Sequence, residues 1–146
     1  MTGKPDDASV SAWIALSRAQ RVAFRSVEER LKSAGLPPLA WYDALWELEK
    51  AGEQGLRPFE LERALLFEQY NLSRLADRLA GAGLVERKPC RDDARGHVLT
   101  ITSAGRELRR RMWTVYSEAI EEAVGRRLGT AEAETLAALL RKLEQP

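Results

Sequence analysis

The sequence is poor in cysteine and histidine and has no long apolar run. A single cysteine among 146 residues excludes an internal disulfide and favours a reducing compartment over secretion. A single histidine argues against a multi-histidine metal site. No apolar run exceeds five residues, whereas a signal peptide needs roughly 7–15 and a membrane span ~20. We therefore expect a cytoplasmic protein that uses neither a metal ion nor another cofactor.

The chain also lacks an excess of charge of either sign. There are 23 Lys and Arg against 22 Asp and Glu, a net charge of +1, with 45% hydrophobic residues, so the composition is that of a folded protein. The length predicts one domain over residues 1–146. A neutral balance is unusual for a DNA-binding domain. Here it conceals an asymmetry, because residues 63–111 hold 11 basic and 6 acidic side chains and the rest of the chain 12 and 16.

Helical periodicity covers most of the chain. A first helix is expected over about 10–34, with Ser9 or Ser11 as N-cap and Gly35 just beyond its end. A second is expected over about 39–51, with Tyr42, Leu45 and Leu48 buried. Pro58 favours the start of a short third helix. That helix should carry Leu61, Leu65 and Leu66, and a fourth helix, about 69–81, should follow after almost no linker.

The periodicity changes after Gly83. Two β-prone runs, 84–88 and 97–102, flank a polar loop and predict a hairpin. Thr102 or Ser103 should cap a fifth helix, and Gly129-Thr130 should begin a last one. The fold class is therefore mainly α with a small β-hairpin, and the order of elements is that of a winged helix-turn-helix. The helix-turn-helix lobe covers 39–102 and the wing, meaning the hairpin, covers about 84–102.

The fourth helix has two unlike faces. Leu72, Leu75, Ala76 and Leu79 form an apolar stripe at helical spacing. The opposite face carries the polar side chains that can contact base edges and phosphates in a major groove: Tyr70, Asn71, Ser73, Arg74 and Arg78. Taken alone, this face could equally be an ordinary solvated surface.

The hairpin tip is rich in positive charge. Its basic residues are Arg87, Lys88, Arg91 and Arg95, against Asp92 and Asp93. A protruding arginine suits the narrow minor groove beside the groove that a helix occupies. The alternative is a solvated tip whose charges prevent edge aggregation.

Three segments resemble the MarR family of bacterial winged-helix transcriptional regulators: Leu36 to Gly55, Arg57 to Arg87 and Asp92 to Gly105. The matching elements include Ser73-Arg74-Leu75, Asp77-Arg78-Leu79, Gly83-Leu84-Val85-Glu86-Arg87 and Asp93-x-Arg95. The resemblance implies a homodimer, joined through helices at 10–34 and 103–146, that binds a pseudo-palindromic operator in double-stranded DNA as a repressor. It also implies that a small molecule relieves repression.

The resemblance assigns individual residues. Asn71, Ser73, Arg74 and Arg78 match the recognition-helix contacts, and Arg95 matches the wing arginine with Asp93 as its support. Gln69 and Tyr70 lie where phosphates are usually met. With the wing cations Lys88 and Arg91, these positions form the expected DNA-binding site.

An effector pocket is expected near aromatic side chains. Trp13, Trp41, Tyr42 and Trp46 suit an aromatic or phenolic molecule, although aromatics at helical spacing are more often core. Cys90 does not stand where oxidant-sensing members carry their cysteine, so we interpret it as a bystander in the wing. His97 is interpreted as a strand residue.

Two other classes of function fit the sequence less well. A winged-helix protein-protein interaction module without sequence-specific DNA binding is the alternative. An enzyme is the least supported class, since no phosphate-binding loop or metal-ligand spacing is present.

Overall fold

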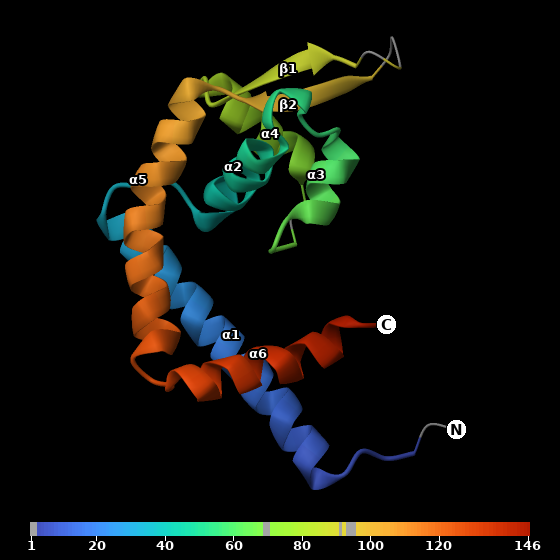
Figure 1. The fold of residues 1–146 in the computed structure, drawn as a ribbon, viewed down its shortest axis with the longest axis vertical. Helices are drawn as coiled ribbons and strands as arrows, with labels where there is room; N and C mark the ends of the chain where they lie inside the picture. The colour runs from blue at the N-terminus through green and yellow to red at the C-terminus, as the bar shows by residue number, and fades with distance from the viewer. Residues whose placement is uncertain (1–2, 69–70, 91, 93–95) are drawn as a thin grey trace. The chain divides into compact units, whose positions relative to one another are not determined.

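The computed structural model describes residues 3–68, 71–90, 92 and 96–146 (Figure 1). The described part of the chain is mainly helical, with one β-hairpin. The elements are α1 (Asp7–Ser33), α2 (Leu39–Ala51), the 3-10 turn η1 (Gly52–Gln54), α3 (Pro58–Ala64), α4 (Leu72–Gly81), β1 (Val85–Pro89), β2 (His97–Ile101), α5 (Ser103–Ile120), the π-helical turn η2 (Glu121–Gly125) and α6 (Thr130–Glu144). The predicted fold class is confirmed.

The chain divides into two compact units, and the divisions fall inside α1 and α5. The first unit contains residues 1–30 and 116–146, and the second contains 31–115. The second unit holds the whole helix-turn-helix lobe and wing. The expectation that 1–146 acts as one domain stays a prediction.

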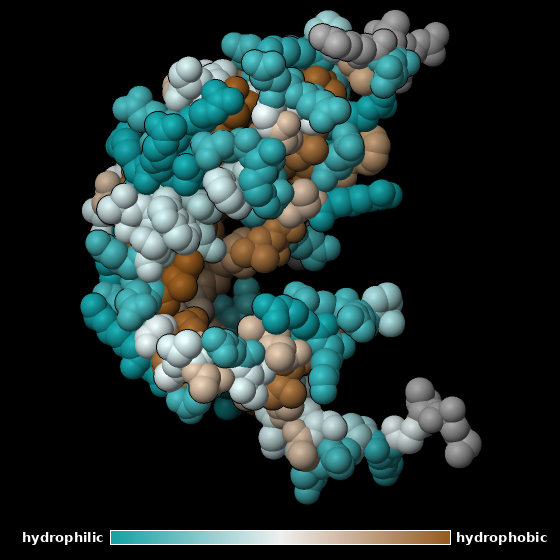
Figure 2. Space-filling view, viewed as in Figure 1, coloured by the Kyte–Doolittle hydropathy of each residue, from teal (hydrophilic) through white to brown (hydrophobic). Residues whose placement is uncertain are grey.

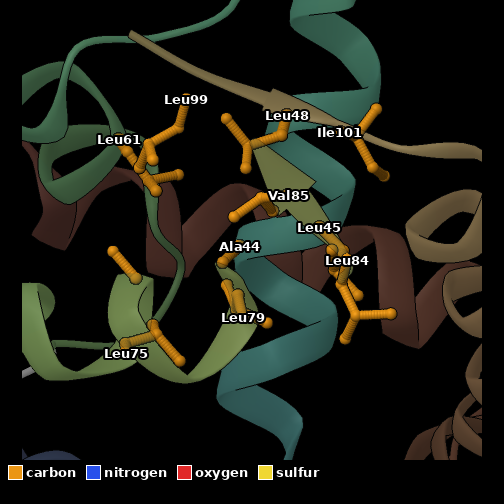
Figure 3. Close-up of a cluster of buried hydrophobic side chains, with 11 residues drawn as sticks. Ala44, Leu45, Leu48, Leu61, Leu75, Leu79, Leu84, Val85, Leu99 and Ile101 are labelled. Carbon is orange, nitrogen blue, oxygen red and sulfur yellow. The ribbon is translucent and has the colours of Figure 1, made fainter. Parts of the chain in front are cut away.

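The second unit is built around one apolar cluster (Figure 3). Helix α2 supplies Ala44, Leu45 and Leu48, which are fully buried. The remaining members come from α3, α4 and the wing: Leu61, Leu75, Ala76, Leu79, Leu84, Val85, Leu99 and Ile101. This cluster holds α4 and the wing on a common base.

The wing is an antiparallel pair with Val85 opposite Ile101 and Pro89 opposite His97. Leu56 adds a short bridge to Leu99, with N–H to carbonyl distances of 3.0 and 2.8 Å. Gly55 makes this approach possible, since a Cβ there would lie 2.4 Å from the carbonyl oxygen of Leu99. This bridge therefore attaches the wing to the segment that leads into α3.

Local sequence signals explain most helix ends. Gly83 has a φ of 75° and donates to the carbonyl of Ala80, while Leu84 donates to that of Leu79, which closes α4 with a Schellman motif. Thr102 caps α5, because its hydroxyl oxygen accepts the N–H of Gly105 at 3.1 Å. Gly35 follows the end of α1, as expected.

Several predicted boundaries were wrong. α1 begins at Asp7 because the carboxylate of Asp6 accepts the N–H of Ser9 at 2.7 Å, so neither Ser9 nor Ser11 is the cap. α3 ends at Ala64, since Leu65 is extended with ψ of 138°. Leu66 is therefore outside the helix and 70% exposed.

The connections around α4 and α5 also differ from expectation. α4 begins at Leu72, and seven residues rather than almost none separate it from α3. After Ile120 the backbone of α5 passes into the π-helical turn.

The first unit has few buried side chains. Val27 and Ala119 are buried, and Arg30 pairs with Glu118 at 3.0 Å and with Glu122. Much of its apolar surface stays open to solvent. Its exposed large apolar residues are Val10, Trp13, Ile14, Val22, Phe24, Ile120, Val124, Leu136, Leu139 and Leu143.

Candidate nucleic-acid interface

Helix α4 presents the polar face that its sequence predicts. Ser73, Arg74 and Arg78 are exposed, while Leu75 and Leu79 are buried in the apolar cluster. The helix therefore presents two guanidinium groups and a hydroxyl group to solvent along one side, while the apolar side chains between them in sequence are buried. Such a face can donate hydrogen bonds to base edges and to phosphate oxygens.

Asn71 has a structural task at the start of this helix. Its side-chain oxygen accepts the backbone N–H of Arg74 at 2.9 Å, which makes it the N-cap of α4. This bond occupies the carbonyl end of the amide. The predicted contact of Asn71 with DNA stays a prediction, and any such contact must come from a residue that also holds the helix end.

The wing carries its cations on the exposed strand. Glu86, Arg87 and Lys88 of β1 are exposed, whereas Leu99 and Thr100 of β2 are buried. Arg87 forms an ion pair with Asp77 of α4. The wing and the polar face of α4 are therefore joined by a direct side-chain contact that the sequence did not predict.

Five residues of the expected site lie outside the described part of the chain. They are Gln69, Tyr70, Arg91, Asp93 and Arg95. Their predicted roles, including that of Asp93 as support for Arg95, remain predictions.

Cys90 lies at the end of β1, half-buried. The guanidinium of Arg57 donates to its sulfur at 2.9 Å. Both residues line a cavity of about 1070 Å³ together with Lys88 and Glu60. Arg57 precedes α3, so this contact also links the wing to the segment that leads into α3.

His97 is the exposed first residue of β2, as expected. Within residues 3–68, 71–90, 92 and 96–146, no group of three or more His, Cys, Asp or Glu side chains could hold a metal ion. No helix in this described part is long and apolar enough to cross a membrane.

The expected effector aromatics divide between the two units. Trp13 belongs to the first unit and is 70% exposed. Trp41, Tyr42 and Trp46 lie on α2 in the second unit, where Trp41 packs against the apolar cluster.

Tyr42 and Trp46 lie beside residues of α5. Tyr42 stacks on Trp113 with 6.0 Å between ring centroids, and Arg109 lies 5.0 Å from the centroid of Trp46. Arg109 is held by Glu49 at 3.1 Å. Burial raises the pKa of Tyr42, with the hydrogen bond and positive charge of Arg109 acting in the opposite direction.

Asp43 is a buried acid that no sequence pattern singles out. One of its carboxylate oxygens accepts the backbone N–H of Phe67 at 3.0 Å. Burial raises its pKa, and the backbone N–H groups of Leu66 and Phe67 oppose that shift. This contact joins α2 to the turn between α3 and α4.

Part of the sequence is similar to one known family. A sequence model described as the MarR family matches residues 34–96. The multiple antibiotic resistance protein MarR of Escherichia coli K12 is 30% identical over 88 residues. That alignment covers 60% of this chain and 61% of the relative, which is less than two thirds of the relative's length.

Solved structures share the fold over nearly the whole chain. Sco3205, a MarR family transcriptional regulator from Streptomyces coelicolor solved in complex with DNA, superposes with a TM-score of 0.87 at 24% identity, covering 99% of this chain and 93% of that one. A variant of Escherichia coli MarR complexed with operator DNA gives 0.80 at 23% identity, covering 97% and 99%. The chain is similar to the MarR family of transcriptional regulators in sequence over residues 34–96, and it shares the fold of these solved structures over nearly its whole length.

Proposed function

We propose that this protein is a sequence-specific regulator of transcription that binds double-stranded DNA through α4 and the wing. The observation that carries the proposal is the exposed face of α4, where Ser73, Arg74 and Arg78 stand opposite the buried leucines. Helix α4 enters the major groove, and the wing contacts the backbone and the adjacent minor groove. The fold shared with relatives solved on DNA supports this docking.

The distribution of charge supports the same surface. The excess of basic residues over 63–111 falls on the segment that contains α4 and the wing, while the rest of the chain is acidic. An acidic remainder is repelled by phosphates, so a duplex is met by the basic side of the lobe.

The functional unit in this proposal is a homodimer. The first unit exposes large apolar side chains on the terminal helices, including Trp13 at 70%, Leu139 at 52% and Leu143 at 65%. Figure 2 shows hydrophobic side chains, in brown and tan, at the surface of α6. Exposed apolar surface of this extent is typical of a protein-protein interface. A second copy that covers it brings two copies of α4 to a pseudo-palindromic operator.

The protein acts as a repressor that a small aromatic or phenolic molecule releases. Two states differ in the spacing of the two α4 helices, and a ligand that prefers the other state lowers the affinity for DNA by the ratio of its two affinities. Trp41, Tyr42 and Trp46 are the candidate contacts in the second unit, with Trp13 in the first.

A competition gel shift tests the function. The protein is titrated onto DNA taken from upstream of its own gene and onto random duplex of equal length, at several salt concentrations. A regulator prefers its own DNA at every salt concentration, and the affinity for both duplexes falls as salt rises. Equal affinity for both duplexes contradicts the proposal and favours a module that binds other proteins.

The oligomeric state is tested separately by sedimentation. The wild type is expected to sediment as a dimer. Leu139→Glu places a charge on the exposed apolar surface and is expected to shift the protein towards monomer. Arg141→Glu serves as a charge-change control, because Arg141 is exposed and lies two residues further along α6, on the opposite side of the helix. A monomeric wild type contradicts the dimer.

A further inference from the structure

Asp43 stands out among the charged residues. At 5% exposure it is the one charged residue that is buried in the part of the chain that the structure describes. Taking a carboxylate out of water costs free energy, so a buried acid is weak evidence of a contribution to stability. Its retention inside an otherwise apolar lobe calls for a local reason.

The partner of Asp43 is the turn of the helix-turn-helix. The carboxylate accepts the N–H of Phe67 at 3.0 Å, and the N–H of Leu66 also favours its charged form. Leu66 and Phe67 lie between the two helices, because α3 ends at Ala64 and α4 begins at Leu72. Asp43 supplies the acceptor that a helical carbonyl would otherwise provide.

Helix α2 supports α4 at a second point. Ala44 and Leu45, the residues after Asp43, lie in the apolar cluster with Leu75 and Leu79 of α4 (Figure 3). Apolar packing is not directional, so it resists separation of the helices better than sliding. A hydrogen bond to a charged acceptor is directional, so it fixes the entry of the chain into α4.

We propose that Asp43 is a positioning residue of the DNA-binding surface: from α2 it holds the turn at Leu66 and Phe67 and thereby fixes the start and orientation of α4. The inference rests on the proposed function. Asp43 does not touch DNA; it sets where Arg74 and Arg78 stand when α4 meets the groove. Sequence discrimination depends on that placement more than non-specific affinity does, because base contacts need exact geometry and phosphate attraction does not.

Three variants test this role. Asp43→Ala removes the acceptor. Asp43→Asn keeps one acceptor oxygen of similar shape without the charge. Leu39→Ala, on the same helix and buried but outside the apolar cluster that supports α4, lowers stability and keeps the carboxylate of Asp43.

Two measurements are made on each full-length variant at a temperature where unfolding curves show it folded. The first is the ratio of affinities for its own upstream DNA and random duplex. The second is amide hydrogen exchange at Leu66, Phe67 and the first turn of α4, compared with the last turn. Exchange reports local opening, which a general loss of stability does not confine to one end of a helix.

For Asp43→Ala we expect the affinity ratio to fall by about fivefold or more, with non-specific affinity nearly unchanged. Protection of the Leu66 and Phe67 amides from hydrogen exchange should fall together with the affinity ratio. Asp43→Asn recovers most of both losses, and Leu39→Ala keeps the affinity ratio despite its lower stability.

Different failures have different meanings. If the wild type discriminates and Asp43→Ala discriminates equally well, the inference is wrong while the function stands. If Leu39→Ala lowers the affinity ratio as far as Asp43→Ala does, Asp43 acts only through stability and the positioning role is wrong. A wild type that does not discriminate contradicts the function and the inference together.

Discussion

Arg87 of the wing and Asp77 of α4 form an ion pair that joins the two parts of the proposed DNA-binding surface. Asp77 lies between Arg74 and Arg78 in the sequence, and both it and its partner are open to solvent, at 70% and 38% exposure of the side chain. The pair orders the base of the wing relative to α4, and it places one negative charge beside the basic face.

The pair is expected to contribute little to folding. Asp77→Asn, Arg87→Gln and the double variant form a cycle whose coupling free energy of unfolding should be about 0.2–1 kcal/mol, because exposed ion pairs are screened by water. Urea unfolding at low and high salt measures it, and the coupling should shrink in high salt. A coupling well above 1 kcal/mol that salt leaves unchanged contradicts this description.

Asn71 is expected to serve the fold through its cap. Asn71→Ala should cost about 0.5–2 kcal/mol of stability, because the N–H of Arg74 loses its acceptor. Asn71→Ser restores a neutral cap. Asn71→Asp also restores the cap, and its carboxylate interacts favourably with the positive end of the α4 dipole. In the complex, however, the same negative charge is repelled by the DNA phosphates.

Thermal unfolding and DNA titration of these three variants separate the two roles of Asn71. Serine and aspartate should both recover stability, and aspartate alone should weaken binding to every duplex. If aspartate binds DNA like the serine variant, the start of α4 does not approach the phosphates.

Arg74 is expected to read the sequence of the DNA. Arg74→Ala keeps the capping bond, which uses the backbone N–H, and removes only the exposed guanidinium. Loss of a base contact should cost about 1–3 kcal/mol on the specific duplex and relax sequence preference. Arg141→Ala, on the side of α6 away from its exposed leucines, removes the same charge at a distance in sequence from α4 and should leave the preference intact. Equal affinity ratios for wild type and Arg74→Ala contradict the docking.

Asp43 predicts a pH dependence of stability. Burial raises its pKa above the ordinary value of 3.8 in the folded protein, with Glu47 adding to the shift and Lys50 opposing it. The folded state therefore binds this proton more readily than the unfolded state, and ionised Asp43 costs stability at neutral pH. That cost diminishes as pH falls through the raised pKa towards 3.8.

Asp43→Asn removes the charge at every pH. It should be more stable than the wild type at neutral pH, and the difference should narrow under acid. Urea unfolding of both proteins across this range measures the difference. The opposite result is an Asp43→Asn variant that is less stable than the wild type at neutral pH and equally stable under acid. That result would mean that the turn lowers the pKa of Asp43, and it would contradict the raised pKa assigned here.

Local signals in the sequence predicted much of this fold. Gly83, followed by a β-prone run, marks the end of α4 correctly because a glycine at positive φ closes a helix whatever packs around it. The apolar stripe of Leu75 and Leu79 likewise predicts the buried face of α4, since one helix determines it alone.

Contacts between distant residues escaped prediction. The bond between Asp43 and Phe67 joins residues 24 apart in sequence, and it exists only because α2 packs against the turn. Helical periodicity predicts too early a start for α4, because the aromatic and amide residues before Leu72 fit a helical face. The helix instead begins after Asn71, whose role as N-cap depends on backbone angles that periodicity does not report. Local periodicity contains neither fact.

Hydroxyl-radical footprinting of the wild-type protein on DNA from upstream of its own gene addresses the central proposal most directly. Two recognition helices and two wings on a pseudo-palindrome should protect two matching sets of backbone positions, with centres about 10 base pairs or a multiple of that spacing apart. Protection should persist in the presence of excess random duplex. A uniform pattern that random duplex abolishes would contradict sequence-specific reading by α4 and the wing.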